Sequence, residues 1–147
     1  MQTVTVTREF EAPRETIERE LADLEPFMQA GGFTEVTVDG DRIDIRNAVG
    51  FLEIELELEV VDRKGAALAY VQRDGIFSEM ETRYVVDERD DGCAVAATTE
   101  FEVDVQYLGP VFDATVVRRQ RRHELRRQFD YLEAQVAARG EHVPDER

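Results

Sequence analysis

The sequence predicts one α+β domain in which a curved antiparallel sheet wraps around a long C-terminal helix. Three observations lead to this fold class. Apolar and polar residues alternate with a period of two over much of residues 34–103. A helical segment of roughly thirty residues follows, and it would be about 45 Å long. Each clear strand has one apolar and one charged face, and only this last helix is long enough to cover the apolar side.

The chain opens with a strand and a helix. Apolar residues occupy alternate positions in the predicted strand over residues 3–10. Pro13 suits the first turn of a helix, and Pro26 is expected to break that helix. Gly31-Gly32 should end a short second turn. The apolar stripe of the helix consists of Ile17, Leu21 and Leu24.

Six further strands are predicted before the last helix. The clearest covers residues 52–60, where aliphatic residues alternate with four glutamates. A helix would scatter both sets around its circumference, whereas a strand places them on opposite faces. Asp39-Gly40 is a strong hairpin signal, and residues 87–92 are expected to form a hairpin loop. The predicted strands are 34–38, 42–46, 52–60, 66–73, 76–86 and 93–103.

The last helix is predicted to begin at Gly109-Pro110, to run to about Arg139 and to be ended by Gly140. The domain is then residues 1–140, and residues 141–147 form a polar tail. Two apolar stripes are expected on this helix. The stripe of its first half includes, on or near it, Val111, Phe112, Thr115, Val116, Arg119 and His123, and the stripe of its second half consists of Leu125, Phe129, Leu132 and Val136.

The composition is strongly acidic. The 147 residues include 33 acids and 18 bases, giving a net charge of −15, and Lys64 is the only lysine. This composition resembles that of extreme halophiles, where salt screens the repulsion between surface acids. The alternative is an ordinary acidic protein. A negative surface argues against general nucleic-acid binding, because phosphates would be repelled.

Several other classes of protein are disfavoured. The longest apolar runs are too short to span a membrane, and the N-terminus lacks the apolar block of a signal peptide. With Cys93 as the only cysteine, no internal disulfide can form, which fits a cytoplasmic protein. His123 and His142 have no metal-ligand spacing, so no metal and no cofactor is expected. Cys93 is interpreted as a small core residue.

The opening segment TVTREFEAPRETIERELAD and the closing segment LGPVFDATVVRRQRRHELRRQFDYLEAQV resemble those of the START/Bet v 1-like (SRPBCC) superfamily, which includes polyketide cyclase/dehydrase-like proteins. The resemblance covers about residues 3–139. It implies a helix-grip fold, with a seven-stranded sheet around the last helix and a ligand cavity between them. It implies no particular substrate, because the superfamily hosts lipid carriers, hormone receptors, cyclases and subunits of larger assemblies.

The predicted function is binding of a small hydrophobic molecule, lipid-like or aromatic, in that cavity. Inward apolar side chains with a few hydroxyls suit such a ligand. Arg119 and His123, spaced i, i+4, are the expected polar end of the cavity, and the Tyr84 hydroxyl is expected to orient the ligand. The predicted ligand-binding residues are Ile54, Leu56, Met80, Thr82, Tyr84, Thr99, Phe101, Phe112, Val116, Arg119 and His123.

Two alternatives remain open. The first is a cyclase- or dehydratase-like enzyme that uses the same cavity, with Tyr84, His123 or Gln72 as acid–base groups. The second is an accessory protein whose arginine-rich helix docks an acidic partner, or a second copy in a homodimer. The structural interpretation of these arginines is pairing with acids such as Glu124 and Asp130. The basic run consists of Arg118, Arg119, Arg121, Arg122, Arg126 and Arg127.

Overall fold

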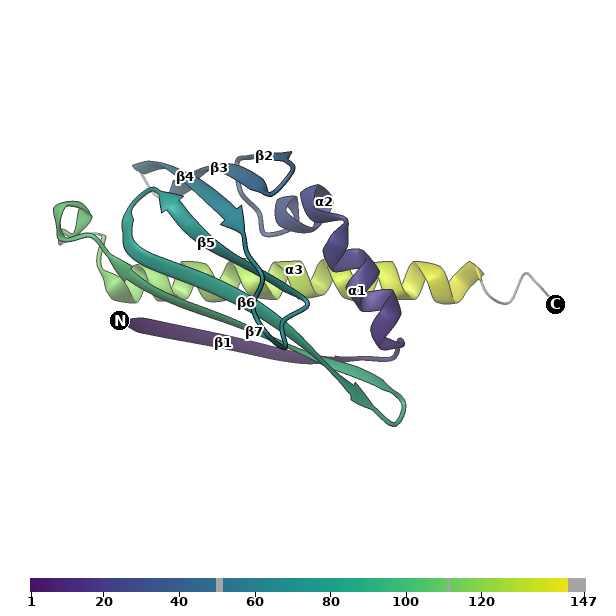
Figure 1. Ribbon diagram of the computed structural model, residues 1–147. Helices are drawn as coiled ribbons and strands as arrows, with labels where there is room; N and C mark the ends of the chain where they lie inside the picture. The colour runs from purple at the N-terminus through teal and green to yellow at the C-terminus, as the bar shows by residue number, and fades with distance from the viewer. Residues whose placement is uncertain (50–51, 111, 143–147) are drawn as a thin grey trace.

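The computed structural model describes residues 1–49, 52–110 and 112–142. Within these ranges, seven strands form one antiparallel sheet in the order β1-β7-β6-β5-β4-β3-β2. The sheet curves around the long helix α3, as Figure 1 shows. The predicted α+β fold class is confirmed. The elements are β1 (Gln2–Phe10), α1 (Arg14–Ala22), α2 (Leu24–Gln29), β2 (Glu35–Asp39), β3 (Arg42–Val49), β4 (Leu52–Val60), β5 (Leu68–Asp74), β6 (Phe77–Arg89), β7 (Gly92–Val103), the 3-10 turn η1 (Val105–Tyr107) and α3 (Ala114–His142).

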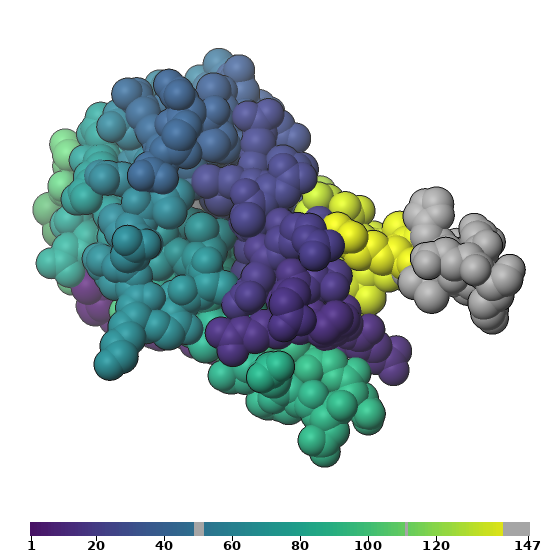
Figure 2. Space-filling model, turned by 45° about the vertical axis from the view of Figure 1, so that its right-hand side comes forward, coloured from purple at the N-terminus to yellow at the C-terminus, as the bar shows by residue number. Residues whose placement is uncertain are grey.

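The second half of α3 packs into the core along the predicted stripe. Leu125, Phe129 and Leu132 recur at i, i+4 and i+7 and are fully buried. The Phe129 ring meets the ring of Phe10 from β1 edge to face, with 6.0 Å between centroids. The helix also contacts α1, α2 and β7. Its C-terminal end projects beyond the rest of the protein (Figure 2).

The alternating pattern of β4 is confirmed. Ile54 and Leu58 are buried, whereas the glutamates between the aliphatic residues lie on the other face of the sheet. Arginines on the neighbouring strands offset the repulsion between these glutamates. Arg42 lies 3.3 Å from Glu57, and Arg73 lies 2.5 Å from Glu59. The glutamate ladder is therefore part of the solvated surface.

Two hairpin turns are short. Asp39 pairs with Arg42, so the β2–β3 turn has two central residues. The first of these, Gly40, has a φ of +62°, which an L side chain rarely adopts, and this explains the Asp39-Gly40 signal. The loop predicted over residues 87–92 is mostly strand, because β6 and β7 remain paired up to Arg89 and Gly92.

The helix boundaries differ from the prediction at three places. Pro26 lies inside the first turn of α2, where a helix needs no backbone N–H, and the break falls at Asp23. Helix α3 begins at Ala114, after Asp113 accepts a hydrogen bond from the Val116 N–H at 3.0 Å. Gly140 does not end α3, since one glycine costs a helix only about 1 kcal/mol. Residues 143–147 of the predicted tail lie outside the described residues.

Candidate functional site

A small cavity lies between the concave face of the sheet and the first half of α3. Its volume is about 30 Å³, which is room for about one water molecule. Pockets that hold drug-sized ligands measure roughly 300–1,000 Å³, so side chains fill nearly all of the predicted space. The lining is apolar at Phe33, Ile54, Leu56, Ile76, Phe77, Phe112 and Val117, and polar at Asn47, Gln120, Arg121 and Glu124.

An ion pair between Arg121 and Glu124 forms part of the cavity wall. The two residues are spaced i, i+3 on α3, and Arg121 Nη1 lies 2.5 Å from Glu124 Oε1. Only 6% of Arg121 and 3% of Glu124 is exposed. Taking both charges out of water costs several kcal/mol per ion, and their attraction offsets this only when further hydrogen bonds complete the site.

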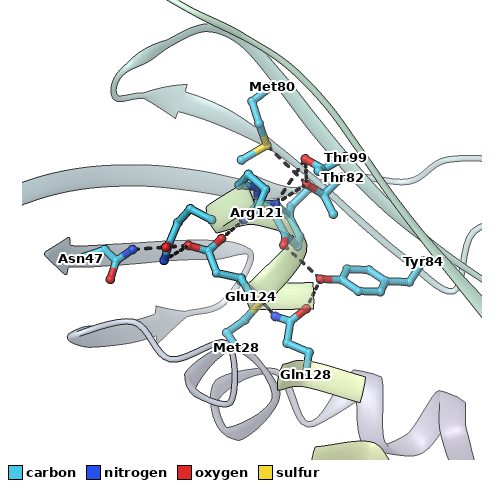
Figure 3. A network of polar contacts seen from close by, with 11 residues as sticks. Met28, Asn47, Met80, Thr82, Tyr84, Thr99, Arg121, Glu124 and Gln128 are labelled. Carbon is cyan, nitrogen blue, oxygen red and sulfur yellow. Dashed lines mark hydrogen bonds and ion pairs between the residues drawn. The ribbon is translucent and has the colours of Figure 1, made fainter. Parts of the chain in front are cut away.

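The sheet and α3 supply those further hydrogen bonds, which Figure 3 shows. Arg121 Nη2 donates to the hydroxyls of Thr82 and Thr99 at 3.1 and 3.3 Å. Glu124 Oε2 accepts from Asn47 Nδ2 at 3.4 Å and from Gln120 Nε2 at 3.2 Å. One buried polar atom of this group, Nε of Arg121, has no hydrogen-bond partner among the described residues.

The two charges respond differently to burial. Burial raises the pKa of Glu124, although Arg121 and the hydrogen bond from Gln120 oppose this shift. Burial also disfavours the charge of Arg121, but the neighbouring Glu124 outweighs this, so the pKa of Arg121 lies above its ordinary value. Arg121 therefore stays charged, and Glu124 is the member of the pair that can take up a proton.

A second group of polar side chains lies deeper in the core. The Tyr84 hydroxyl donates to Gln128 Oε1 at 2.5 Å and lies 3.2 Å from the Tyr70 hydroxyl. Gln128 Nε2 in turn lies 3.8 Å from Met28 Sδ. Burial raises the pKa of Tyr84 well above its ordinary value, so this phenol remains a hydrogen-bond donor.

The variant Tyr84→Phe is expected to lower the free energy of unfolding by about 1–3 kcal/mol, since the buried Gln128 carbonyl would lose its donor. The ring is kept, so packing changes little. Urea unfolding of the two proteins measures the loss. Tyr107→Phe is the control, because Tyr107 is 43% exposed and should change stability by less than about 0.5 kcal/mol. Equal effects of the two substitutions would contradict a structural role for the Tyr84 hydroxyl.

The structure brings only part of the predicted site to the cavity. Ile54, Leu56 and Phe112 line it. Five other predicted residues are buried without lining the cavity, and ligand contact by them stays a prediction: Met80, Thr82, Tyr84, Thr99 and Phe101. The inward orientation predicted for Tyr84 with Thr82 and Thr99 is confirmed.

The predicted polar end of the cavity was wrong. Arg119 and His123 are exposed, and Val116 is only half-buried. Two residues along a helix turn the side chain by about 200°, so Arg119 and His123 lie on the side opposite Arg121. The available signal was the stripe of Leu125 and Phe129, which reaches Arg121 and Val117 when extended backwards in steps of four.

The other candidates have structural roles. The Gln72 amide donates to the Phe77 carbonyl at 2.7 Å and accepts from the Phe77 N–H at 3.1 Å, which closes the turn between β5 and β6. Cys93 is buried, and burial raises the pKa of its thiol, as fits a core residue. Within the part of the chain that the structure describes, no group of three or more His, Cys, Asp or Glu side chains is placed to hold a metal ion, and no helix is long and apolar enough to cross a membrane.

The arginine run does not form one surface. Arg121 is buried, whereas Arg118, Arg119, Arg126 and Arg127 are exposed. The predicted pairing with Glu124 is confirmed for Arg121. Asp130 instead pairs with Arg8 of β1 at 2.7 Å.

A larger hollow of about 770 Å³ lies at the other end of the fold, between β1, the tip of the β6–β7 hairpin and the end of α3. Its lining includes five carboxylates, Glu9, Glu11, Asp90, Asp91 and Glu133. Such a lining is unsuited to an apolar ligand, so the small cavity beside Arg121 is the better candidate.

Comparison with known proteins gives similarity in structure only. No protein-family model matches the sequence, and no curated protein matches it. A solved structure from Thermus thermophilus is 19% identical, with a TM-score of 0.73 over 93% of this chain and 98% of that one. A START superfamily protein from Mycobacterium smegmatis is 18% identical, with a TM-score of 0.67 over 92% and 97% of the two chains.

A third solved structure, the Zhui aromatase/cyclase from Streptomyces, is 14% identical and has a TM-score of 0.76 over 94% of each chain. Identities this low carry the fold and no particular activity. The match extends over nearly the whole chain, including the sheet and the helix that it surrounds. The protein therefore has the START/Bet v 1-like (SRPBCC) helix-grip fold.

Proposed function

We propose that the protein binds a small, mostly apolar molecule between the sheet and α3, with a polar group of the ligand directed toward Arg121. The observation that carries this proposal is the buried Arg121–Glu124 pair in the wall of a mostly apolar cavity. A buried ion pair is often no more stabilising than apolar residues of similar size, so stability alone gives little reason for it. Structural similarity to a START superfamily protein and an aromatase/cyclase supports the same use of the cavity.

Ligand entry requires the cavity to enlarge. Phe33 and Phe112 form part of its wall, and both lie outside regular helices and strands. Segments between elements move more readily than the elements themselves. Outward movement of these two rings would enlarge the cavity without disturbing the sheet or the buried stripe of α3.

Binding of a neutral fluorescent probe, N-phenyl-1-naphthylamine, tests the proposal. The wild-type protein is expected to bind the probe, and Val117→Phe should weaken binding at least about tenfold by filling the cavity. Val116→Phe is the matched control, because Val116 is half-buried and does not line the cavity. Native mass spectrometry of the purified protein shows any ligand retained from the cell. A wild-type protein that neither binds the probe nor retains a ligand would refute the proposal.

A cyclase- or dehydratase-like reaction is the second candidate, and Glu124 is the observation that favours it. A buried carboxylate whose pKa is raised can exchange a proton with a bound molecule. Incubation with a linear aryl diketone, followed by mass spectrometry for loss of water, tests this activity. Turnover that persists in Glu124→Gln would exclude Glu124 as the acid or base.

Three finer expectations stay predictions. The ligand is lipid-like or aromatic, the protein acts in a salt-rich cytoplasm, and the exposed arginines of α3 provide a contact for an acidic partner or a second copy. Sedimentation measurements over a range of KCl concentrations would test the last two expectations together. Both the compactness of an acidic protein in salt and the association of two copies through charged residues change as salt screens the charges.

A further inference from the structure

We propose that the site selects neutral ligands that carry a hydrogen-bond acceptor, such as a ketone or lactone carbonyl, over carboxylates with the same skeleton. This inference rests on the proposed function and names the class of molecule that the cavity takes. It follows from the charge balance and the hydrogen-bond balance around Arg121.

The charge of Arg121 is already compensated. Its guanidinium lies 2.5 Å from the Glu124 carboxylate, and both side chains are more than nine-tenths buried. A carboxylate ligand would place a second negative charge beside one positive charge in a region of low dielectric constant. A neutral carbonyl adds no charge, so the ion pair favours it over an acid of equal size.

The position of the Glu124 carboxylate is fixed by two further hydrogen bonds. Asn47 from β3 and Gln120 from α3 both donate to its Oε2 atom. An anionic ligand that displaced Glu124 from Arg121 would leave these two amide donors without their acceptor. Because buried donors without acceptors are costly, the carboxylate cannot be exchanged for a ligand acid without loss.

The hydrogen-bond balance favours an acceptor over a hydrocarbon. Arg121 gives its Nη1 to Glu124 and its Nη2 to the two threonines, and the buried Nε–H is left over. A carbonyl oxygen accepts one or two hydrogen bonds and brings no donor of its own. The guanidinium has five N–H groups, and these three bonds leave the Nε–H and one Nη1 N–H free to donate to a ligand carbonyl, which a hydrocarbon cannot accept.

Competition against N-phenyl-1-naphthylamine at pH 8 and constant KCl tests the selectivity. The panel consists of 2-acetylnaphthalene, 2-naphthoate and 2-ethylnaphthalene, and of 2-nonanone, nonanoate and nonane. Within at least one skeleton, the ketone is expected to bind at least about tenfold more tightly than the carboxylate and more tightly than the hydrocarbon. If the probe binds but neither ketone exceeds its matched carboxylate, the selectivity is refuted and ligand binding stands. If the probe does not bind and native mass spectrometry shows no retained ligand, the proposed function itself is refuted.

The variant Glu124→Gln provides the second arm, because it removes one negative charge and keeps the shape. Carboxylate affinity should rise at least about tenfold and overtake that of the ketone. Glu133→Gln is the matched control, since Glu133 is an exposed glutamate on the same helix, and its ligand preference should equal that of the wild type. An unchanged preference in a folded Glu124→Gln protein would overturn the inference. If that variant does not fold, the order of affinities that the wild-type protein shows for the panel decides whether the inference holds.

Discussion

Replacing Arg121 with methionine is expected to lower the free energy of unfolding by about 3–5 kcal/mol, because Glu124 would remain buried without its counter-ion. Methionine roughly keeps the length and apolar volume of the arginine stem, so the charge is the main change. The hydroxyls of Thr82 and Thr99 would also lose the donor that now lies 3.1 and 3.3 Å away. Urea unfolding at constant KCl measures the loss.

The loss should depend on pH. Burial already raises the pKa of Glu124, and removal of Arg121 would raise it further. The folded variant then binds a proton that the unfolded chain releases near the ordinary pKa of a glutamate. Stability of the variant should therefore fall as the pH rises from about 4.5 through the raised pKa, so the loss is larger at pH 8 than at pH 5.

Two further proteins make this result interpretable. The double variant Arg121→Met/Glu124→Gln should recover much of the lost stability, because no unpaired charge remains buried. Arg119→Met, two residues earlier and exposed, should change stability by less than about 0.5 kcal/mol. If Arg121→Met costs no more than Arg119→Met, the ion pair is not buried in solution and the proposed polar wall of the cavity does not exist.

The fold could be predicted because its signals are local. The alternation of residues 52–60 identifies a strand without knowledge of any partner, and the stripe from Leu125 to Leu132 identifies a buried helix face. The helix ends were predicted less well. Pro26 and Gly140 are tolerated within helices here, since their costs are small or fall where no hydrogen bond is lost.

The site could be predicted only in part, because its polar groups pair across the fold. Arg121 occurs within a run of arginines, and charged residues in such a run are normally solvated. Thr82 and Thr99 accept hydrogen bonds from Arg121, and Asn47 donates one to Glu124. These three partners of the buried pair come from β6, β7 and β3, which are distant from α3 in sequence. Cavity size was not predictable either, since it depends on how the side chains of residues from several elements pack around it.

Truncating Phe129 to alanine is expected to lower the free energy of unfolding by about 3–5 kcal/mol, because it leaves a large void between α3 and the sheet. The ring is fully buried, meets Phe10 edge to face and lies 5.6 Å from the Arg8 guanidinium carbon above it. Val136→Ala, on the same helix but half-buried, should cost at most about 1 kcal/mol and serves as the control. Urea unfolding of both variants measures the difference.

This substitution also tests whether α3 forms one wall of the binding cavity. Phe129 lies two helical turns beyond Arg121 on the same face, so the contact that buries Phe129 also fixes the direction in which Arg121 points. Phe129→Ala should therefore weaken probe binding as well as stability, although the residue does not line the cavity. A Phe129→Ala protein as stable as Val136→Ala would mean that the helix is not packed against the sheet, and the cavity beside Arg121 would then lack one of its walls.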